Sequence, residues 1–305
     1  MVLLSFSLSY FQAIVMGALQ GVAELFPISS LGHSILLPAW LGGSWSEMVK
    51  SQDSTADSPF LAFIVALHVA TAVALVLYYW RDWVQVALGV VDMVRTRSIE
   101  SARSRLAALL IIATIPVGIL GIIADKKLRH LFGNPRDAAI FLIINGLILL
   151  LVEQLTRRSR RRDGGAHAAT ISHGGSDAED FAHLGFGEAT AIGASQALAL
   201  LPGISRSGSA ISAGLLRGLD HAKATHFAFL LATPVILGAG LLKIPELFKP
   251  ENSGIHGQVL VGSIAAFVAA LVAVAFLARY MRTRTLYPFM AYCLVAGVVS
   301  LVHFA

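Results

Sequence analysis

The sequence predicts an all-α polytopic membrane protein, with six transmembrane helices and two re-entrant helix pairs arranged as an inverted-topology repeat. Its composition, the spacing of its apolar segments and an internal repeat predict this class. Of its 305 residues, 56% are apolar and 13% are charged, whereas a soluble domain carries about 25% charged residues. With a mean hydropathy of +0.73, this composition excludes a water-soluble globule and a disordered chain. The single cysteine, Cys293, excludes an intrachain disulfide.

Six apolar segments are long enough to cross a bilayer, which takes roughly 20 apolar residues per helix. Two further apolar regions, 2–39 and 186–219, are interrupted by polar residues and by Pro27 and Pro202. Because broken backbone at membrane depth is tolerated only inside protein or beside a wet cavity, both regions are predicted to be re-entrant helix pairs. The six predicted spans cover about residues 60–80, 105–124, 138–155, 226–243, 257–278 and 286–304.

The basic residues predict the orientation in the membrane. Four segments between apolar stretches carry 14 Lys and Arg residues, whereas three segments expected on the opposite side carry 6. Cytoplasmic loops collect Lys and Arg, so the first set is expected in the cytoplasm. Because most basic residues lie in these loops, the net charge of +5 does not indicate nucleic-acid binding. The cytoplasmic set comprises 81–105, 156–187, 220–225 and 279–285, and the opposite set comprises 40–59, 125–137 and 244–256.

An internal repeat relates the two halves of the chain. Residues 17–35 and 193–211 align without gaps, and nine of the 19 aligned positions are identical. Three predicted spans follow each copy, so the second copy is expected upside down relative to the first. Inverted repeats with broken helices place a binding site near the bilayer midplane. We therefore expect a single membrane domain, 1–305, made of repeat one (1–155), a cytoplasmic linker (156–185) and repeat two (186–305).

The linker 156–185 begins with a run of arginines and continues with Gly, Ser and His. Its three histidines, His167, His173 and His183, could form a metal-binding tract. Their loose spacing and the lack of a cysteine among them favour a flexible, solvated loop instead.

Polar and titratable side chains gather at the first helix break. Gln20 and Glu24 are four residues apart, which places them on one face of a helix. Ser29 and Ser30 stand where N-caps of the next helix belong, and His33 lies one turn into that helix. The carboxylate and amide oxygens of Glu24 and Gln20 are ligands that Mg²⁺ or Ca²⁺ accepts. Ser30 and His33 provide a candidate nucleophile and base.

The second break carries the features of an anion site. Gly203 lies in the break, Ser205 occupies the N-cap position and Arg206 follows directly. Ser207 and Gly208 keep the first turn of the next helix small, so that a ligand can approach its backbone N–H groups. A helix N-terminus beside an arginine attracts phosphate, because the guanidinium can donate two hydrogen bonds at once. Together the two breaks suit cleavage of a phosphate ester or anhydride at a membrane.

Simpler interpretations exist for these features. Gly, Ser and Pro in membrane helices often serve only packing and kinking. His68, alone in an apolar segment, is expected to be a buried polar contact, and Glu153 and Gln154 are expected at the membrane interface. An alternative function is a transporter or lipid flippase, because inverted repeats with broken helices are typical of transporters. A flippase needs an anion site but no nucleophile and base, so Ser30 and His33 favour an enzyme.

Three motifs resemble those of a known family. Residues 20–33, QGVAELFPISSLGH, are similar to the Glu/Gln-x-x-x-Glu…Pro-x-Ser-Ser-x-Gly-His motif of the bacterial undecaprenyl-diphosphate phosphatases of the bacitracin-resistance type. Residues 201–208, LPGISRSG, resemble the Pro-Gly-x-Ser-Arg-Ser-Gly motif of that family, and residues 227–234, FAFLLATP, resemble its Phe-x-Phe-Leu-Leu-Ala-x-Pro stretch. Apart from the linker, the resemblance covers nearly the whole chain.

The resemblance implies hydrolysis of undecaprenyl diphosphate to undecaprenyl phosphate and inorganic phosphate. This reaction recycles the lipid carrier of cell-wall synthesis and gives resistance to bacitracin. The resemblance also implies a bound Mg²⁺ or Ca²⁺ ion and a homodimer. It further implies a location in the bacterial inner (plasma) membrane, surrounded by membrane lipids, with the active site toward the periplasm.

The resemblance assigns roles to the candidate catalytic residues. Glu24 and Gln20 would hold the metal ion or its water, Ser30 would be the nucleophile, and His33 would be the general base or acid. Arg206 would clamp the diphosphate and stabilise the charge that develops during transfer. The other residues expected to bind the substrate are Ser29, Gly203, Ser205, Ser207 and Gly208.

Two positions depart from the motifs of the family. Gln20 stands where many relatives have Glu, so one expected metal ligand is neutral and a lower metal affinity is expected. Leu31 replaces a hydroxyl residue that is frequent there, so that hydroxyl is not essential in this chain. The sequence leaves open whether Ser30 attacks phosphorus or positions a metal-bound water.

Overall fold

The part of the chain that the computed structural model describes is predominantly helical and contains no β-strand. A helix satisfies its own backbone hydrogen bonds, so long apolar segments fold in this way where water is absent. The described residues are 8–50, 59–128, 134–162, 181, 183–249 and 254–305. The helices of the first half are α1 (Tyr10–Ala23), α2 (Ser30–Leu41), α3 (Gly43–Lys50), α4 (Pro59–Tyr78), α5 (Trp80–Thr96), α6 (Ala102–Leu128) and α7 (Pro135–Arg162).

The second half begins, like the first, with two helices separated by a short break. The break follows η5, a 3₁₀-helix that continues directly from α8. The predicted interruptions of both apolar regions are therefore present. The helices of the second half are α8 (Phe186–Ser195), η5 (Gln196–Leu200), α9 (Arg206–Leu216), α10 (His221–Lys243), the 3₁₀-helix η6 (Ile244–Phe248), α11 (His256–Tyr280) and α12 (Tyr287–His303).

Five helices are long and apolar enough to cross a membrane, namely α4, α6, α7, α10 and α11. Four of them contain one of the predicted spans, and α4 covers the predicted span 60–80 except for its last two residues. The sixth predicted span, 286–304, forms α12, which has 17 residues and is shorter than the roughly 20 residues that a crossing takes. By length and composition, the structure thus supports a polytopic membrane protein with five candidate spans.

The described residues of the predicted linker 156–185 do not form the expected flexible loop. Helix α7 continues through the basic run to Arg162, so the first part of the linker is helical. His167 and His173 lie outside the described residues. The solvated-loop prediction is therefore wrong for 156–162, and it is also wrong for Phe181 and Leu184, whose side chains are buried. It stays a prediction for 163–180, which lie outside the described residues.

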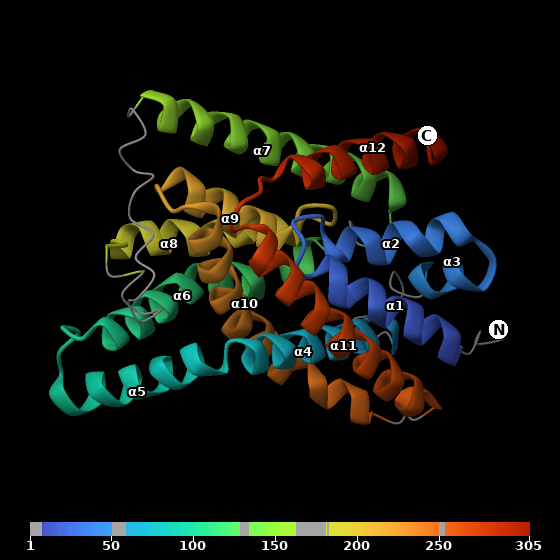
Figure 1. The fold of residues 1–305 in the computed structure, drawn as a ribbon. Coiled ribbons are helices and arrows are strands. Elements are labelled where there is room, and N and C mark those ends of the chain that lie inside the picture. The colour runs from blue at the N-terminus through green and yellow to red at the C-terminus, as the bar shows by residue number, and fades with distance from the viewer. Residues whose placement is uncertain (1–7, 51–58, 129–133, 163–180, 182, 250–253) are drawn as a thin grey trace.

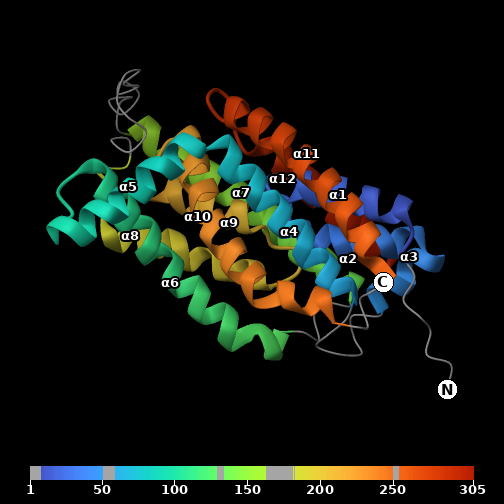
Figure 2. The same ribbon diagram turned by 90° about the horizontal axis from the view of Figure 1, so that it is seen from below.

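The two copies of the repeat make the same kind of close helix contact. Helix α1 packs along α11, and α8 packs along α6 (Figures 1 and 2). Gly17 in α1 lies against the backbone of Gly262, and its repeat equivalent, Gly193, lies against the backbone of Ala113. A Cβ atom at either position would overlap a carbonyl oxygen of the facing helix. Small residues permit this close approach in membrane helices, so both copies need glycine here.

The break-containing segments lie between two outer helix pairs. Figure 1 shows α7 and α12 side by side along one edge of the molecule, and α5 with α6 at the opposite edge. Helix α9 contacts both α7 and α10, and α2 contacts α7. The two breaks are therefore enclosed by helices that belong to both halves of the chain.

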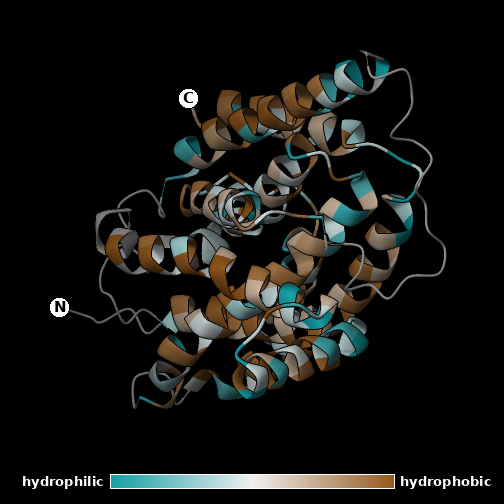
Figure 3. Cartoon of the chain, turned by 90° about the vertical axis from the view of Figure 1, so that its left-hand side faces the viewer, coloured by the Kyte–Doolittle hydropathy of each residue, from teal (hydrophilic) through white to brown (hydrophobic). Residues whose placement is uncertain are grey.

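Many large apolar side chains on the helices are exposed, and Figure 3 shows long hydrophobic stretches along most of the helices. The exposed fraction reaches 76% for Leu241 in α10 and 74% for Val302 in α12. Soluble monomers rarely expose large contiguous apolar patches. This surface therefore fits contact with the acyl chains of lipids.

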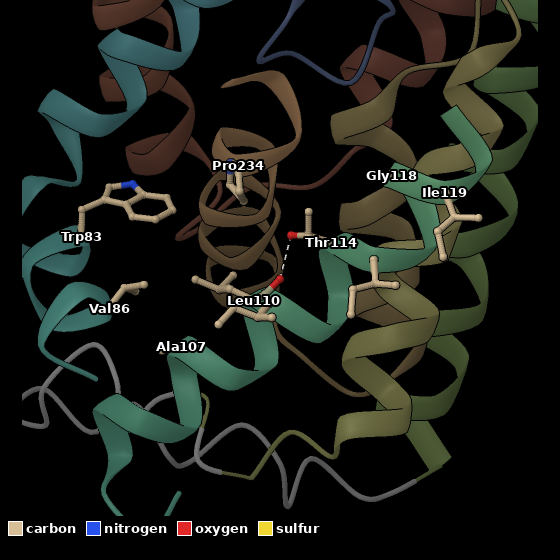
Figure 4. A pocket seen from close by; sticks show the side chains of 10 residues that line it. Trp83, Val86, Ala107, Leu110, Thr114, Gly118, Ile119 and Pro234 are labelled. Carbon is tan, nitrogen blue, oxygen red and sulfur yellow. Dashed lines mark hydrogen bonds between the residues drawn. The ribbon is translucent and has the colours of Figure 1, made fainter. Parts of the chain in front are cut away.

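An apolar groove of about 510 Å³ lies between α5, α6 and α10 (Figure 4). Trp83 and Pro234 lie on two of its walls. Its one hydroxyl, on Thr114, donates a hydrogen bond to the carbonyl oxygen of Leu110 at 2.7 Å. Because none of the residues that line the groove is charged, it does not fit a phosphate group.

Candidate active site

A serine N-cap closes each of the two helix breaks. Ser29 Oγ accepts a hydrogen bond from the backbone N–H of Gly32 at 3.1 Å, and Ser205 Oγ accepts one from Gly208 at 3.0 Å. Such caps satisfy backbone donors that have no partner in the first turn of a helix. Because Ser29 and Gly32 are the repeat equivalents of Ser205 and Gly208, α2 and α9 have the same side-chain cap.

The two breaks are hydrogen-bonded to each other. Ser29 Oγ also accepts a hydrogen bond from the backbone N–H of Gly203 at 3.2 Å. In the opposite direction, the hydroxyls of Ser205 and Ser207 donate to the carbonyl oxygen of Phe26, at 3.4 Å and 3.1 Å. These serines were expected to bind substrate, and here they join two segments that lie 174 to 181 residues apart.

Two residues in the breaks have a positive φ angle. Gly203 has a φ of +115°, and a Cβ atom there would overlap the carbonyl oxygen of Ala138 in α7. Ser29 has a φ of 72°, a conformation that costs a residue other than glycine about 1–3 kcal/mol. The hydrogen bonds that Ser29 Oγ accepts from Gly32 and Gly203 offset that cost.

Asn145, in the middle of α7, binds both breaks with one amide group. Its Nδ2 donates to the carbonyl oxygen of Pro27 at 2.9 Å, and its Oδ1 accepts from the backbone N–H of Ser205 at 3.0 Å. The side chain is buried, so these bonds replace the water that would otherwise satisfy the breaks. Asn145 belongs to none of the motifs, although an isolated amide in an apolar span is a signal of a functional position.

Glu24 is the centre of the polar cluster between the breaks. Its Oε1 accepts a hydrogen bond from a terminal nitrogen of Arg206 at 2.7 Å. Its Oε2 accepts one from Ser30 Oγ at 2.6 Å and one from Gln20 Nε2 at 3.0 Å. The side chain of Glu24 is 4% exposed and that of Arg206 is 14% exposed, so the ion pair is largely buried. The structure thus brings together four of the residues that the sequence singled out.

Two further residues contact this cluster. Gln196 Oε1 accepts a hydrogen bond from the other terminal nitrogen of Arg206 at 3.3 Å. His68 Nε2 lies 3.3 Å from Glu24 Oε2. His68 was expected to be a buried polar contact, and the contact proves to be with the central carboxylate. Gln196 is the repeat equivalent of Gln20, a relation that could have identified it in the sequence.

His33 lies outside the polar cluster around Glu24. Its Nδ1 is 2.7 Å from the carbonyl oxygen of Ser29, and its Nε2 is 2.7 Å from the hydroxyl of Tyr292 in α12. The two rings also stack, with centroids 5.6 Å apart. Both ring nitrogens are therefore engaged, and the structure does not bring His33 to the hydroxyl of Ser30.

Glu153 corrects the expectation of an interfacial carboxylate. It is 1% exposed, and its carboxylate contacts Arg157 Nε at 2.9 Å and His221 Nε2 at 2.7 Å. His221, the first residue of α10, and the backbone N–H of Leu286, just before α12, both contact Glu153 Oε2. The position of a residue near the end of a span does not reveal such contacts. Gln154 is exposed, as an interfacial residue would be.

The residues of the cluster can hold a cation only together with a ligand. No group of three or more His, Cys, Asp or Glu side chains suited to a metal occurs in the described part of the chain. However, Gln20 Oε1 is buried and has no hydrogen-bond partner there, which is costly for a polar atom. With Glu24 it offers two oxygens, and Mg²⁺ is commonly held by one or two side chains plus substrate phosphates. The donor set fits a divalent ion shared with a phosphate.

The arrangement can bind an anion and move a proton. The guanidinium of Arg206 stands at the N-terminus of α9, where the helix dipole and the backbone N–H groups favour negative charge. The hydroxyl of Ser30 already donates to a carboxylate, which is the geometry for general base catalysis. Fold and site thus define an integral, α-helical membrane protein with a site for phosphate chemistry.

The chain belongs to the family described as "Bacitracin resistance protein BacA", whose model matches residues 13–299. It is 52% identical over 301 residues to the undecaprenyl-diphosphatase of Mycolicibacterium paratuberculosis, with 98% of each chain covered. It is 47% identical over 338 residues to undecaprenyl-diphosphatase 2 of Frankia alni, again with 98% of each chain covered. The undecaprenyl-diphosphatase of Granulibacter bethesdensis is 41% identical over 305 residues, covering 98% of this chain and 99% of its own. The resemblance of the motifs to this family is confirmed.

Proposed function

We propose that this protein removes the terminal phosphate from undecaprenyl diphosphate, giving undecaprenyl phosphate and inorganic phosphate. The product is the lipid carrier of cell-wall synthesis, so the reaction recycles the carrier and gives resistance to bacitracin. One observation carries the proposal. Ser30 Oγ lies 2.6 Å from a carboxylate oxygen of Glu24, whose other oxygen lies 2.7 Å from Arg206. The names of the relatives support the choice of substrate.

Arg206 is the group that we assign to the diphosphate. A guanidinium can bind a phosphate with two parallel hydrogen bonds, and it stabilises the charge on the phosphoryl oxygens during transfer. In the present structure Arg206 donates to Glu24 and Gln196. A diphosphate therefore competes with these acceptors for the guanidinium, which turns from them toward the substrate.

Ser30 and Glu24 perform the displacement in one of two ways. In the first, Ser30 Oγ attacks the terminal phosphorus while its proton passes to Glu24, the bond to the bridging oxygen breaks, and undecaprenyl phosphate leaves; water then releases the phosphate from Ser30. In the second, Ser30 only orients a water that attacks directly. The hydrogen bond between Ser30 and Glu24 favours Glu24, rather than His33, as the base.

We propose that Mg²⁺ or Ca²⁺ binds together with the substrate. Gln20 Oε1 and the carboxylate of Glu24 would hold the ion, and oxygens of the diphosphate would complete its shell. Gln20 Oε1 has no hydrogen-bond partner among the described residues, which supports this assignment. When bound, the ion would neutralise part of the charge of the diphosphate.

Phosphate release from a C55 prenyl diphosphate tests the function. The purified protein, in detergent, is expected to release inorganic phosphate, and EDTA is expected to stop the release. Restoration by Mg²⁺ or Ca²⁺ after removal of EDTA controls for damage to the protein. If monodisperse protein binds the lipid and releases no phosphate, the enzyme assignment is wrong and the anion site serves transport of the lipid.

We propose the inverted topology for the whole fold. The chain would cross the plasma membrane six times, with α12 as the sixth span, and the breaks would form two re-entrant pairs whose site opens to the periplasm. The matching caps of α2 and α9 and the matching close contacts at Gly17 and Gly193 support an inverted repeat. The homodimer implied by the resemblance stays a prediction, for which the mass of the purified protein is the measurement.

Labelling of single cysteines is expected to place residues 156–187 in the cytoplasm. The background is Cys293→Ser, which removes the one native cysteine. A cysteine in 156–187 should react with an impermeant maleimide only after the membrane is opened, whereas a cysteine in 40–48 should react in intact cells. Reaction of 156–187 from the periplasm alone would contradict the proposed orientation.

A further inference from the structure

His68 approaches the candidate site from a helix that carries neither motif. It lies in α4 (Pro59–Tyr78), and its Nε2 is 3.3 Å from Glu24 Oε2. Arg206, from α9, occupies the other oxygen, Oε1. The carboxylate of Glu24 is therefore held between two nitrogen groups that come from opposite halves of the chain.

The ring of His68 is held in one orientation. Its Nδ1 lies 2.8 Å from the carbonyl oxygen of Ile64, and its Nε2 faces the carboxylate of Glu24. Because a carbonyl oxygen and a carboxylate can both only accept, the two contacts require a hydrogen on each ring nitrogen. The hydroxyl of Thr71 donates to the carbonyl oxygen of His68 at 2.6 Å. The contacts with Ile64 and Thr71 both lie within α4, so the position of Nε2 does not depend on either helix break.

We propose that His68 is a positioning residue for the hydrolysis, holding the carboxylate of Glu24 in place while the diphosphate engages Arg206. The inference rests on the proposed function. A buried carboxylate whose cation turns to another anion loses the partner that offset its desolvation. His68 contacts the opposite side of Glu24, on the same oxygen that accepts from Ser30. It therefore keeps the carboxylate of Glu24 directed at Ser30 when Arg206 binds phosphate.

The expected kinetic effect is on kcat rather than on KM. His68 contacts the carboxylate and not the guanidinium, so its loss should disturb the proton acceptor and leave substrate binding intact. His68→Leu should lower kcat by about 10- to 100-fold, the usual effect of removing a residue that orients a group in an active site. KM should stay close to the wild-type value, as expected for an interaction used in the reaction step. His68→Gln, whose amide can still donate to Glu24, should recover most of the lost kcat.

His226 offers a matched control. Its Nε2 lies 3.3 Å from Asp82 Oδ1, the same separation as in the pair of His68 and Glu24. Its ring packs against Tyr79 and Phe181 and not against the breaks. His226→Leu therefore also breaks a histidine–carboxylate pair between helices. It should change the thermal midpoint in detergent as His68→Leu does, and it should leave kcat unchanged.

The experiment measures kcat, KM and the thermal midpoint for the wild type and the three variants with a C55 prenyl diphosphate. The inference is supported if His68→Leu lowers kcat at constant KM, His68→Gln restores it, and His226→Leu does not lower it. It is overturned if His68→Leu has the wild-type kcat, if its loss lies in KM, or if His68→Gln is as slow as His68→Leu. Loss of kcat in His226→Leu as well would overturn it, because the effect would then be structural. No phosphate release by the wild type would overturn the proposed function, and this inference with it.

Discussion

Arg206→Ala is expected to lower kcat for undecaprenyl diphosphate by about 10³- to 10⁵-fold, the range lost when an arginine that stabilises phosphoryl transfer is removed. Arg206 stands at the first position of α9, with Glu24 at 2.7 Å. Alanine removes the positive charge and also the planar fork that binds phosphate with two hydrogen bonds. Phosphate release by purified protein measures the loss.

Arg206→Lys separates the contribution of the positive charge to kcat from that of the planar guanidinium. Lysine keeps a positive charge but presents it as a point that cannot form the bidentate pair, so little activity should return. Turnover near the wild-type rate in Arg206→Lys would show that the clamp is assigned wrongly. Arg157→Ala is the matched control, because Arg157 also pairs with a buried carboxylate, that of Glu153, at 2.9 Å, and it should retain turnover.

The lower kcat of Arg206→Ala should not result from unfolding of the protein. Without Arg206, the carboxylate of Glu24 still has Ser30, Gln20 and His68 as neighbours. A monodisperse elution profile in detergent, together with a thermal transition, tests this. Aggregation of Arg206→Ala would mean that the ion pair is needed for assembly of the two breaks, and the kinetic result would then not measure a role in catalysis.

The meeting of Glu24 and Arg206 could be anticipated from the sequence, because the repeat puts each of them in a helix break and inverted repeats bring such breaks together. The sequence marks His68 and Asn145 as isolated polar residues in apolar spans, but it does not indicate which groups they contact. Each lies in a long helix that is apolar on nearly every side, so periodicity does not indicate which face meets the site. Their partners are fixed by the rotation of α4 and α7, which is set by packing alone.

The partners of His33 could not be predicted from the sequence either, although Ser30 lies only three residues away. Its spacing from Ser30 places the two side chains within one turn, and the sequence therefore favours a nucleophile and base. The ring instead turns to the carbonyl oxygen of Ser29 and to Tyr292, a partner 259 residues away that no local pattern predicts. The positive φ of Ser29 could not be predicted from the sequence either, because the sequence indicates only an ordinary N-cap at this position.

Glu24→Gln is expected to lower kcat by about 10²- to 10⁴-fold, the contribution of a general base. Glutamine has nearly the shape of glutamate and can still accept a hydrogen bond from Arg206, but it cannot take the proton of Ser30. Its stability cost should stay below the about 3–5 kcal/mol that an unpaired buried charge costs. Phosphate release and the thermal midpoint are the measurements, and turnover near the wild-type rate would exclude Glu24 as the base.

A double variant separates the contribution of the ion pair to stability from its contribution to catalysis. Glu24→Leu leaves the buried guanidinium of Arg206 with Gln196 as its remaining hydrogen-bond partner in the described part of the chain, so the thermal midpoint should fall strongly. Adding Arg206→Met removes that stranded charge, and removal of a whole buried pair is often neutral for stability. The double variant should therefore regain most of the lost midpoint.

The same double variant should stay inactive, because it has neither the base nor the clamp. Recovery of stability without recovery of turnover would mean that the pair is kept for the reaction and not for the fold. The midpoint of the double variant could instead stay as low as that of Glu24→Leu. The loss of stability would then come from the lost hydrogen bonds of Ser30 and Gln20 to the carboxylate, and not from the unpaired charge of Arg206. The two breaks would then be joined chiefly through Glu24, and its substitutions could not be used to assign a base.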